Sequence, residues 1–240
     1  MRTTRSTAAL VAVALLALVG CGDDDDPDPT TTTASTSSTT VVDTTTSTTR
    51  PAGLEQPAIW PAADVVFASP EEAAEDFVQQ VLGVPPALGE FEEGDARSGE
   101  LDVLSPGEGE VPSTVVRSRL LLRRLGPDDG WFVLAAVNDN ASITTPDAGS
   151  DVPAGPLDVT GRARGFEANV VVNAFVAGQT DDLDREVTTG GALEAPEPFS
   201  VTLDLAGAER DDVVVLLVRG GTGLETDPGD FGAVPVVIGG

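Results

Sequence analysis

The stretch that decides the fold class is residues 199–218, which read FSVTLDLAGAERDDVVVLLV. Its first seven residues alternate between apolar and polar side chains, a pattern that predicts a strand with one buried face. Residues 213–218 are continuously apolar, which predicts a central strand that is buried more completely. The Gly, Ala and Asp residues between the two runs favour a turn.

The sequence on both sides of this stretch continues the same pattern. Seven segments with β character, separated by turns rich in Pro, Gly and Asp, cover residues 142–144, 157–163, 168–176, 185–188, 199–205, 212–219 and 234–238. Seven short strands in about 100 residues are typical of an immunoglobulin-like β-sandwich. The Cys…Trp…Cys spacing of antibody domains is absent, so we expect the core to rest on packing alone.

Short motifs in this region resemble a known family. Residues 155–163 read GPLDVTGRA, residues 166–170 read FEANV, and Pro198-Phe199 precedes a predicted strand. Together these elements resemble the Gmad2 domain, the immunoglobulin-like domain of bacterial spore germination and related envelope proteins, over about residues 140–240. The resemblance implies an extracytoplasmic interaction role and no established set of catalytic residues.

Four positions of these motifs are candidate structural residues: Gly161, Phe166, Glu167 and Phe199. Glu167 is the motif carboxylate, and a functional role for it is one interpretation. The alternative is structural, with Glu167 accepting hydrogen bonds from backbone N–H groups at the start of a strand beside Phe166.

A smaller α+β domain is predicted over residues 58–138, ahead of the immunoglobulin-like domain at 139–240. Residues 69–72 read SPEE, a capping box with Pro at the first helical position. The helix is expected to run to about Leu82 and to stop at Gly83. Residues 100–104, 115–125 and 131–137 predict about three strands, the last two joined as a hairpin.

Three arginines of this domain, Arg117, Arg119 and Arg123, fall on one face of the predicted strand 115–125. On so acidic a chain they could form an anion-binding stripe for carboxylates or phosphates of a glycan. The alternative is a solvated face neutralised by Asp and Glu on neighbouring strands.

The N-terminus predicts export and anchoring. Arg2 and Arg5 precede an apolar run at residues 8–18, which is shorter than the roughly 20 residues of a membrane-spanning helix and indicates a signal peptide over residues 1–20. The following Leu18-Val19-Gly20-Cys21 resembles the bacterial lipobox. The resemblance implies that Cys21 is lipidated and becomes the mature N-terminus. The alternative is an ordinary secretory signal with a chance Cys.

Residues 21–57 combine an acidic run with a tract rich in Ser and Thr. Such a composition cannot bury enough apolar surface to offset chain entropy, so we predict a disordered linker between anchor and folded domains.

Charge and composition exclude several function classes. The 40 acidic residues outnumber the 13 basic ones, giving a net charge of −27, and the chain has no His, Lys or Tyr and a single Cys. Imidazole bases, lysine Schiff bases, histidine metal ligands and an intrachain disulfide are therefore excluded. The charge opposes binding to nucleic acid. We expect no cofactor and no metal. The acidic run at residues 23–26 is interpreted as solvated, and residues 137–141 as a turn between domains. The alternative for each segment is a calcium site.

These observations favour a non-enzymatic lipoprotein on the outer face of the cell membrane. Its lipid anchor would hold an immunoglobulin-like interaction module at the cell envelope, where its partner would be cell-wall polymer or an envelope protein. One alternative is a glycan hydrolase, which requires only two suitably spaced carboxylates. Another is a structural accessory subunit of an envelope complex.

Overall fold

The computed structural model describes residues 53–105 and 115–239, which lie within one compact unit. The predicted signal peptide, Cys21 and the linker up to residue 52 lie outside the described residues. The described part is mainly β, with antiparallel sheets that form a sandwich, so the predicted fold class is confirmed. None of its helices is both long and apolar enough to span a membrane.

The N-terminal part holds a helical segment and four strands. Helix α1 (Pro70–Phe77) continues into a π-helical turn, η1 (Val78–Leu82), which ends at Gly83 with a φ of 69°. The Ser69 hydroxyl accepts a hydrogen bond from the Glu72 N–H at 3.2 Å, so the predicted cap and stop are both confirmed. The strands are β1 (Leu88–Asp95), β2 (Ser98–Leu104), β3 (Val116–Leu125) and β4 (Gly130–Val137).

The C-terminal part contains every strand that the sequence predicts, together with one that it does not. The strands are β5 (Ala141–Thr145), β6 (Asp151–Pro153), β7 (Pro156–Ala163), β8 (Asn169–Val176), β9 (Asp182–Thr189), β10 (Glu197–Asp204), β11 (Val213–Gly220) and β12 (Asp230–Gly239). Strands β1 and β6 are absent from the prediction. β1 is an edge strand with mostly exposed acidic side chains, and β6 has only three residues, so neither carries a periodic apolar signal.

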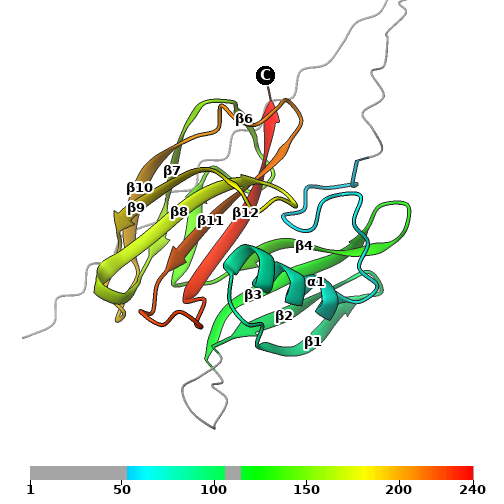
Figure 1. The fold of residues 1–240 in the computed structure, drawn as a ribbon, viewed down its shortest axis with the longest axis horizontal. Coiled ribbons are helices and arrows are strands. Elements are labelled where there is room, and N and C mark those ends of the chain that lie inside the picture. The colour runs from blue at the N-terminus through cyan, green and yellow to red at the C-terminus, as the bar shows by residue number, and fades with distance from the viewer. Residues whose placement is uncertain (1–52, 106–114, 240) are drawn as a thin grey trace, which may run out of the picture. The chain divides into compact units, whose positions relative to one another are not determined.

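The strands form two sheets (Figure 1). The long sheet has the order β1-β2-β3-β4-β12-β11-β8-β9, with β6 pairing the end of β12, and the short sheet has the order β10-β7-β5. Strands β4 and β12 meet where Ala136 pairs with Ala233. The long sheet therefore crosses position 138 without a break, and the division into domains there stays a prediction.

Strand β11 has apolar side chains in two cores. Val214, Leu216 and Val218 pack between the two sheets, whereas Val215 and Leu217 pack in the core beneath α1. The continuous apolar run is thus a central strand buried on both faces, as predicted. The helix covers one face of the long sheet on both sides of the β4–β12 junction.

Candidate functional site

Arg117, the first arginine of the predicted stripe, is held by buried carboxylates. Its Nε and Nη2 donate to the two carboxylate oxygens of Asp227 at 2.9 and 2.6 Å, and its Nη1 lies 3.5 Å from Asp230. Arg164 donates to the other oxygen of Asp230 at 2.8 Å. Arg117 is therefore a structural link between β3 and the segment that leads into β12.

Asp227 is the centre of this network, and its side chain is only 2% exposed. It also accepts hydrogen bonds from the Ser105 hydroxyl at 2.8 Å and the Gly229 N–H at 2.9 Å. Burial alone would raise the pKa of Asp227, but the hydrogen bonds from Arg117, Gly229 and Ser105 outweigh it and leave that pKa lowered. The carboxylate is therefore charged at neutral pH.

The other two arginines of the stripe differ from each other. Arg119 donates from Nε to Asp102 at 2.8 Å and from Nη1 to Glu100 at 3.0 Å, both on β2. Arg123 lies on the same strand face and forms no ion pair with any described residue. Anion binding by this stripe stays a prediction, although neighbouring carboxylates already engage two of its three guanidinium groups.

Residues 137–141, the alternative calcium site of the sequence analysis, form a hydrogen-bonded turn. The Asn138 side-chain amide donates to the Arg117 carbonyl at 2.6 Å, and its oxygen accepts from the Asn140 N–H at 2.6 Å. The oxygen of the Asn138 side chain thus closes the turn, and its NH2 group ties the turn to β3. The acidic run at residues 23–26 lies outside the described residues.

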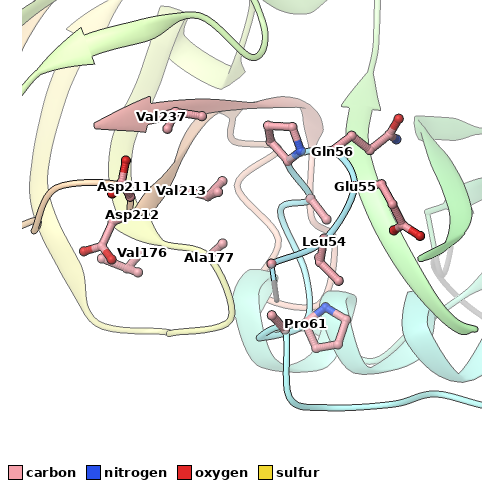
Figure 2. Close-up of a pocket in the computed structure, with 14 residues that line it drawn as sticks. Leu54, Glu55, Gln56, Pro61, Val176, Ala177, Asp211, Asp212, Val213 and Val237 are labelled. Carbon is pink, nitrogen blue, oxygen red and sulfur yellow. The ribbon is translucent and has the colours of Figure 1, made fainter. Parts of the chain in front are cut away.

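One hollow of about 280 Å³ lies beneath residues 53–63 (Figure 2), and we call it the Leu54 hollow. Its walls are mainly apolar and include Leu54, Pro61, Val176, Val213 and Val237. Figure 2 shows Glu55 turned away from it, and that carboxylate accepts from the Gly126 N–H at 2.9 Å. The Glu55 carboxylate therefore contacts the Gly126 backbone and not the interior of the Leu54 hollow.

A second hollow, of about 540 Å³, is more polar. We call it the Arg219 pocket and define it by Leu82, Asn173, Asp182, Arg185, Arg219 and Glu225. Arg219 on β11 lies opposite Val171 on β8, and Arg185 on β9 lies opposite Asn173 on β8. Residues 171 and 173 of a strand point to the same side, so both arginines are on one sheet face, beside the end of η1.

Arg219 is fixed in this pocket by two carbonyl groups. Its Nη1 donates to the Leu82 carbonyl at 3.2 Å and its Nη2 to the Pro228 carbonyl at 3.3 Å. Burial lowers the pKa of Arg219, and the nearby charge of Arg185 lowers it further. Among residues 53–105 and 115–239, neither arginine forms an ion pair. Asp182, in the same lining, accepts from the Asn173 amide at 2.6 Å.

The comparison with protein families identifies the part of the chain that supplies both arginines. Residues 140–220 match the model of the family Gmad2, described as the immunoglobulin-like domain of bacterial spore germination. The chain carries a Gmad2 domain. The match runs from the start of β5 to the end of β11. No curated protein and no solved structure matches the chain.

Two of the motif residues of the Gmad2 domain form one contact. Gly161 on β7 pairs with Phe199 on β10, and Phe199 is buried. A Cβ atom at position 161 would lie 2.1 Å from the Ser142 carbonyl oxygen and 2.7 Å from the Phe199 ring. The glycine therefore lets the aromatic ring and the neighbouring strand β5 approach the β7 backbone closely.

The other two motif residues lie in the connection between β7 and β8 of the Gmad2 domain. Phe166 is 46% exposed, and its N–H donates to the Gly221 carbonyl at 2.7 Å. Glu167 is exposed with a φ of 54°. Its carboxylate accepts no hydrogen bond from any described residue, so the expected bonds from backbone N–H groups to this side chain are not formed.

Arg185 and Arg219 carry no signal in the sequence that predicts a site. Each is an isolated arginine, far from the other along the chain. Only the pairing of β9 and β11 with the two edges of β8 brings them to one pocket. An outward position on a strand is visible in the sequence, but the identity of the neighbouring strand is not.

Proposed function

We propose that this protein is a non-enzymatic lipoprotein that presents its Gmad2 domain as an interaction module on the outer face of the cell membrane. The observation that carries the proposal is the Gmad2 match over residues 140–220. It places an immunoglobulin-like sandwich in a family associated with bacterial spore germination, and rigid sandwiches commonly carry binding residues on their surface and loops.

The lipobox-like segment ending in Cys21 supports the anchoring part of the proposal. A diacylglyceryl group supplies two acyl chains, which hold a protein on a membrane far more firmly than one. Residues 22–52 would span roughly 105 Å when fully extended. A linker of that reach separates the folded part from the bilayer and lets it contact cell-wall polymer or a neighbouring envelope protein.

The Arg219 pocket supports a binding role. It brings two cations, Arg185 and Arg219, to one face of the sheet, and guanidinium groups bind carboxylates and phosphates well. Asp182, in the same lining, accepts a hydrogen bond from the Asn173 amide at 2.6 Å.

Replacing Cys21 by Ser tests the anchor. We expect the unchanged protein to fractionate with membranes and to incorporate a fatty-acid label, and the C21S variant to lose the label and become soluble outside the cytoplasm. Ser37→Ala, in the predicted linker, is the matched control and should behave like the unchanged protein. A C21S variant that stays in the membrane fraction contradicts the proposed anchor.

Incubation of the full chain with purified peptidoglycan tests the non-enzymatic role. Co-sedimentation without soluble fragments supports an interaction module that recognises the wall. Release of fragments, absent with heat-denatured protein, contradicts the proposal and favours the hydrolase. If neither occurs, crosslinking in the native envelope should identify an envelope protein next to the Gmad2 domain. Absence of crosslinks to both cell-wall polymer and envelope proteins contradicts the interaction role.

A further inference from the structure

We infer that the Arg219 pocket binds the terminal carboxylate of a peptide through Arg219 and Arg185. The inference rests on the proposed role as an interaction module and adds the chemistry of the ligand. It is carried by the position of both guanidinium groups in one pocket of about 540 Å³, a size typical of small-ligand sites.

The partly buried arginines differ in the groups that they contact. Arg117 and Arg164 bind the carboxylates of Asp227 and Asp230. Arg219 is held by backbone carbonyls alone, and the adjacent cation, Arg185, repels it. Arg219 is partly buried, whereas Arg185 beside it is exposed. A partly desolvated cation that has no ion pair among the described residues and lies near a second cation is unfavourable. A carboxylate bound between the two would offset the desolvation of Arg219 and the repulsion between them.

The geometry leaves donors for such a ligand. A guanidinium group carries five N–H donors in a rigid fork that matches a carboxylate. The two carbonyls take one Nη1 and one Nη2 donor of Arg219, and the Arg185 side chain donates to no described residue. Because the carbonyls of Leu82 and Pro228 fix Arg219 before a ligand arrives, little side-chain entropy is lost on binding.

The rest of the lining favours a singly charged peptide end over a phosphate group. Asp182 and Glu225 lie in the same pocket and would repel a doubly charged phosphate. Their oxygens can accept hydrogen bonds from the N–H groups of a peptide backbone. Val171 and the exposed Leu224 add apolar surface for a small side chain. A short peptide with a free carboxyl end satisfies all of these groups together.

Calorimetric titration of the purified full chain in detergent tests the inference, with N-acetyl-Ala-Ala as the probe. We expect saturable binding of the free acid and none of its C-terminal amide. Arg185→Gln should weaken binding at least tenfold, because hydrogen bonds between charged groups are lost. Arg210→Gln, which removes an exposed arginine outside the pocket, changes the net charge equally and should bind like the unchanged protein.

Several results would overturn the inference. They are equal binding of acid and amide, equal weakening by R185Q and R210Q, preference for inorganic phosphate or glucuronate over the peptide, and no binding of the peptide at all. Arg185→Gln removes no hydrogen bond within the described residues, so it should leave the fold intact, and a thermal unfolding curve checks this. Membrane fractionation of the same variant separates failure of this site from failure of the proposed anchor.

Discussion

Replacing Asp227 by Asn tests whether the buried ion pair with Arg117 holds β3 against the segment leading into β12. The change keeps the size of the side chain and removes its charge. Breaking a buried ion pair from one side costs about 3–5 kcal/mol. Asp230 remains 3.5 Å from Arg117, whose side chain is 16% exposed, so we expect the lower end, about 3 kcal/mol of unfolding free energy.

Asp102→Asn is the matched control for this substitution. Asp102 accepts from Arg119, also on β3, at 2.8 Å, but the Arg119 side chain is 43% exposed. An exposed ion pair contributes about 0.2–1 kcal/mol. Both variants remove one negative charge from the chain, so any relief of overall repulsion is the same in each, and the difference between them reports burial.

Urea unfolding followed by tryptophan fluorescence measures both variants, since Trp60 and Trp131 are each only 5% exposed. The pH dependence adds a second check. The pKa of folded Asp227 lies below its ordinary value of 3.8, so its stabilising contribution is fully present above that pH. The contribution is lost as the pH falls through the lower folded value. The difference in unfolding free energy between the unchanged protein and D227N should therefore be constant near neutrality and should disappear only in strong acid.

Two outcomes would refute this reasoning. If D227N and D102N lose the same stability, burial does not strengthen the Arg117 pair. If the difference for D227N disappears well above pH 3.8, the charge of Asp227 is not what stabilises the fold. We also expect the double variant, Arg117→Met with Asp227→Leu, to lose less unfolding free energy than D227N alone. In the double variant neither charge of the pair stays buried without its partner.

Two further predictions concern packing and charge. Gly161→Ala should destabilise the protein by roughly 1–3 kcal/mol, because the added Cβ would lie 2.1 Å from the Ser142 carbonyl oxygen. Gly221→Ala, where a Cβ meets nothing within 4 Å, is the control, and equal melting temperatures for the two variants would contradict the packing argument. With a net charge of −27, the chain should also melt at a higher temperature as salt rises to about 1 M, since screening weakens self-repulsion. A melting temperature independent of salt would speak against that expectation.

The sequence by itself determined the elements whose signals are local. The SPEE capping box and Gly83 set the two ends of the helical segment, and the alternation from Phe199 onward marked a half-buried strand. The continuous apolar run in β11 marked a strand buried on both faces. Each of these patterns is contained in a short window, because helix caps and strand faces depend on residues only a few positions apart.

Only the tertiary structure decided how these elements meet. The two halves of the long sheet are joined where Ala136 pairs with Ala233. Both residues are small, and nothing in their side chains predicts that they pair. Asp227 reaches Arg117 from a distant segment, and β8 brings Arg185 and Arg219 to one pocket. Strand partners are chosen by non-local packing and hydrogen bonding, which periodicity within a strand does not encode. The candidate binding site is therefore a property of the folded sheet.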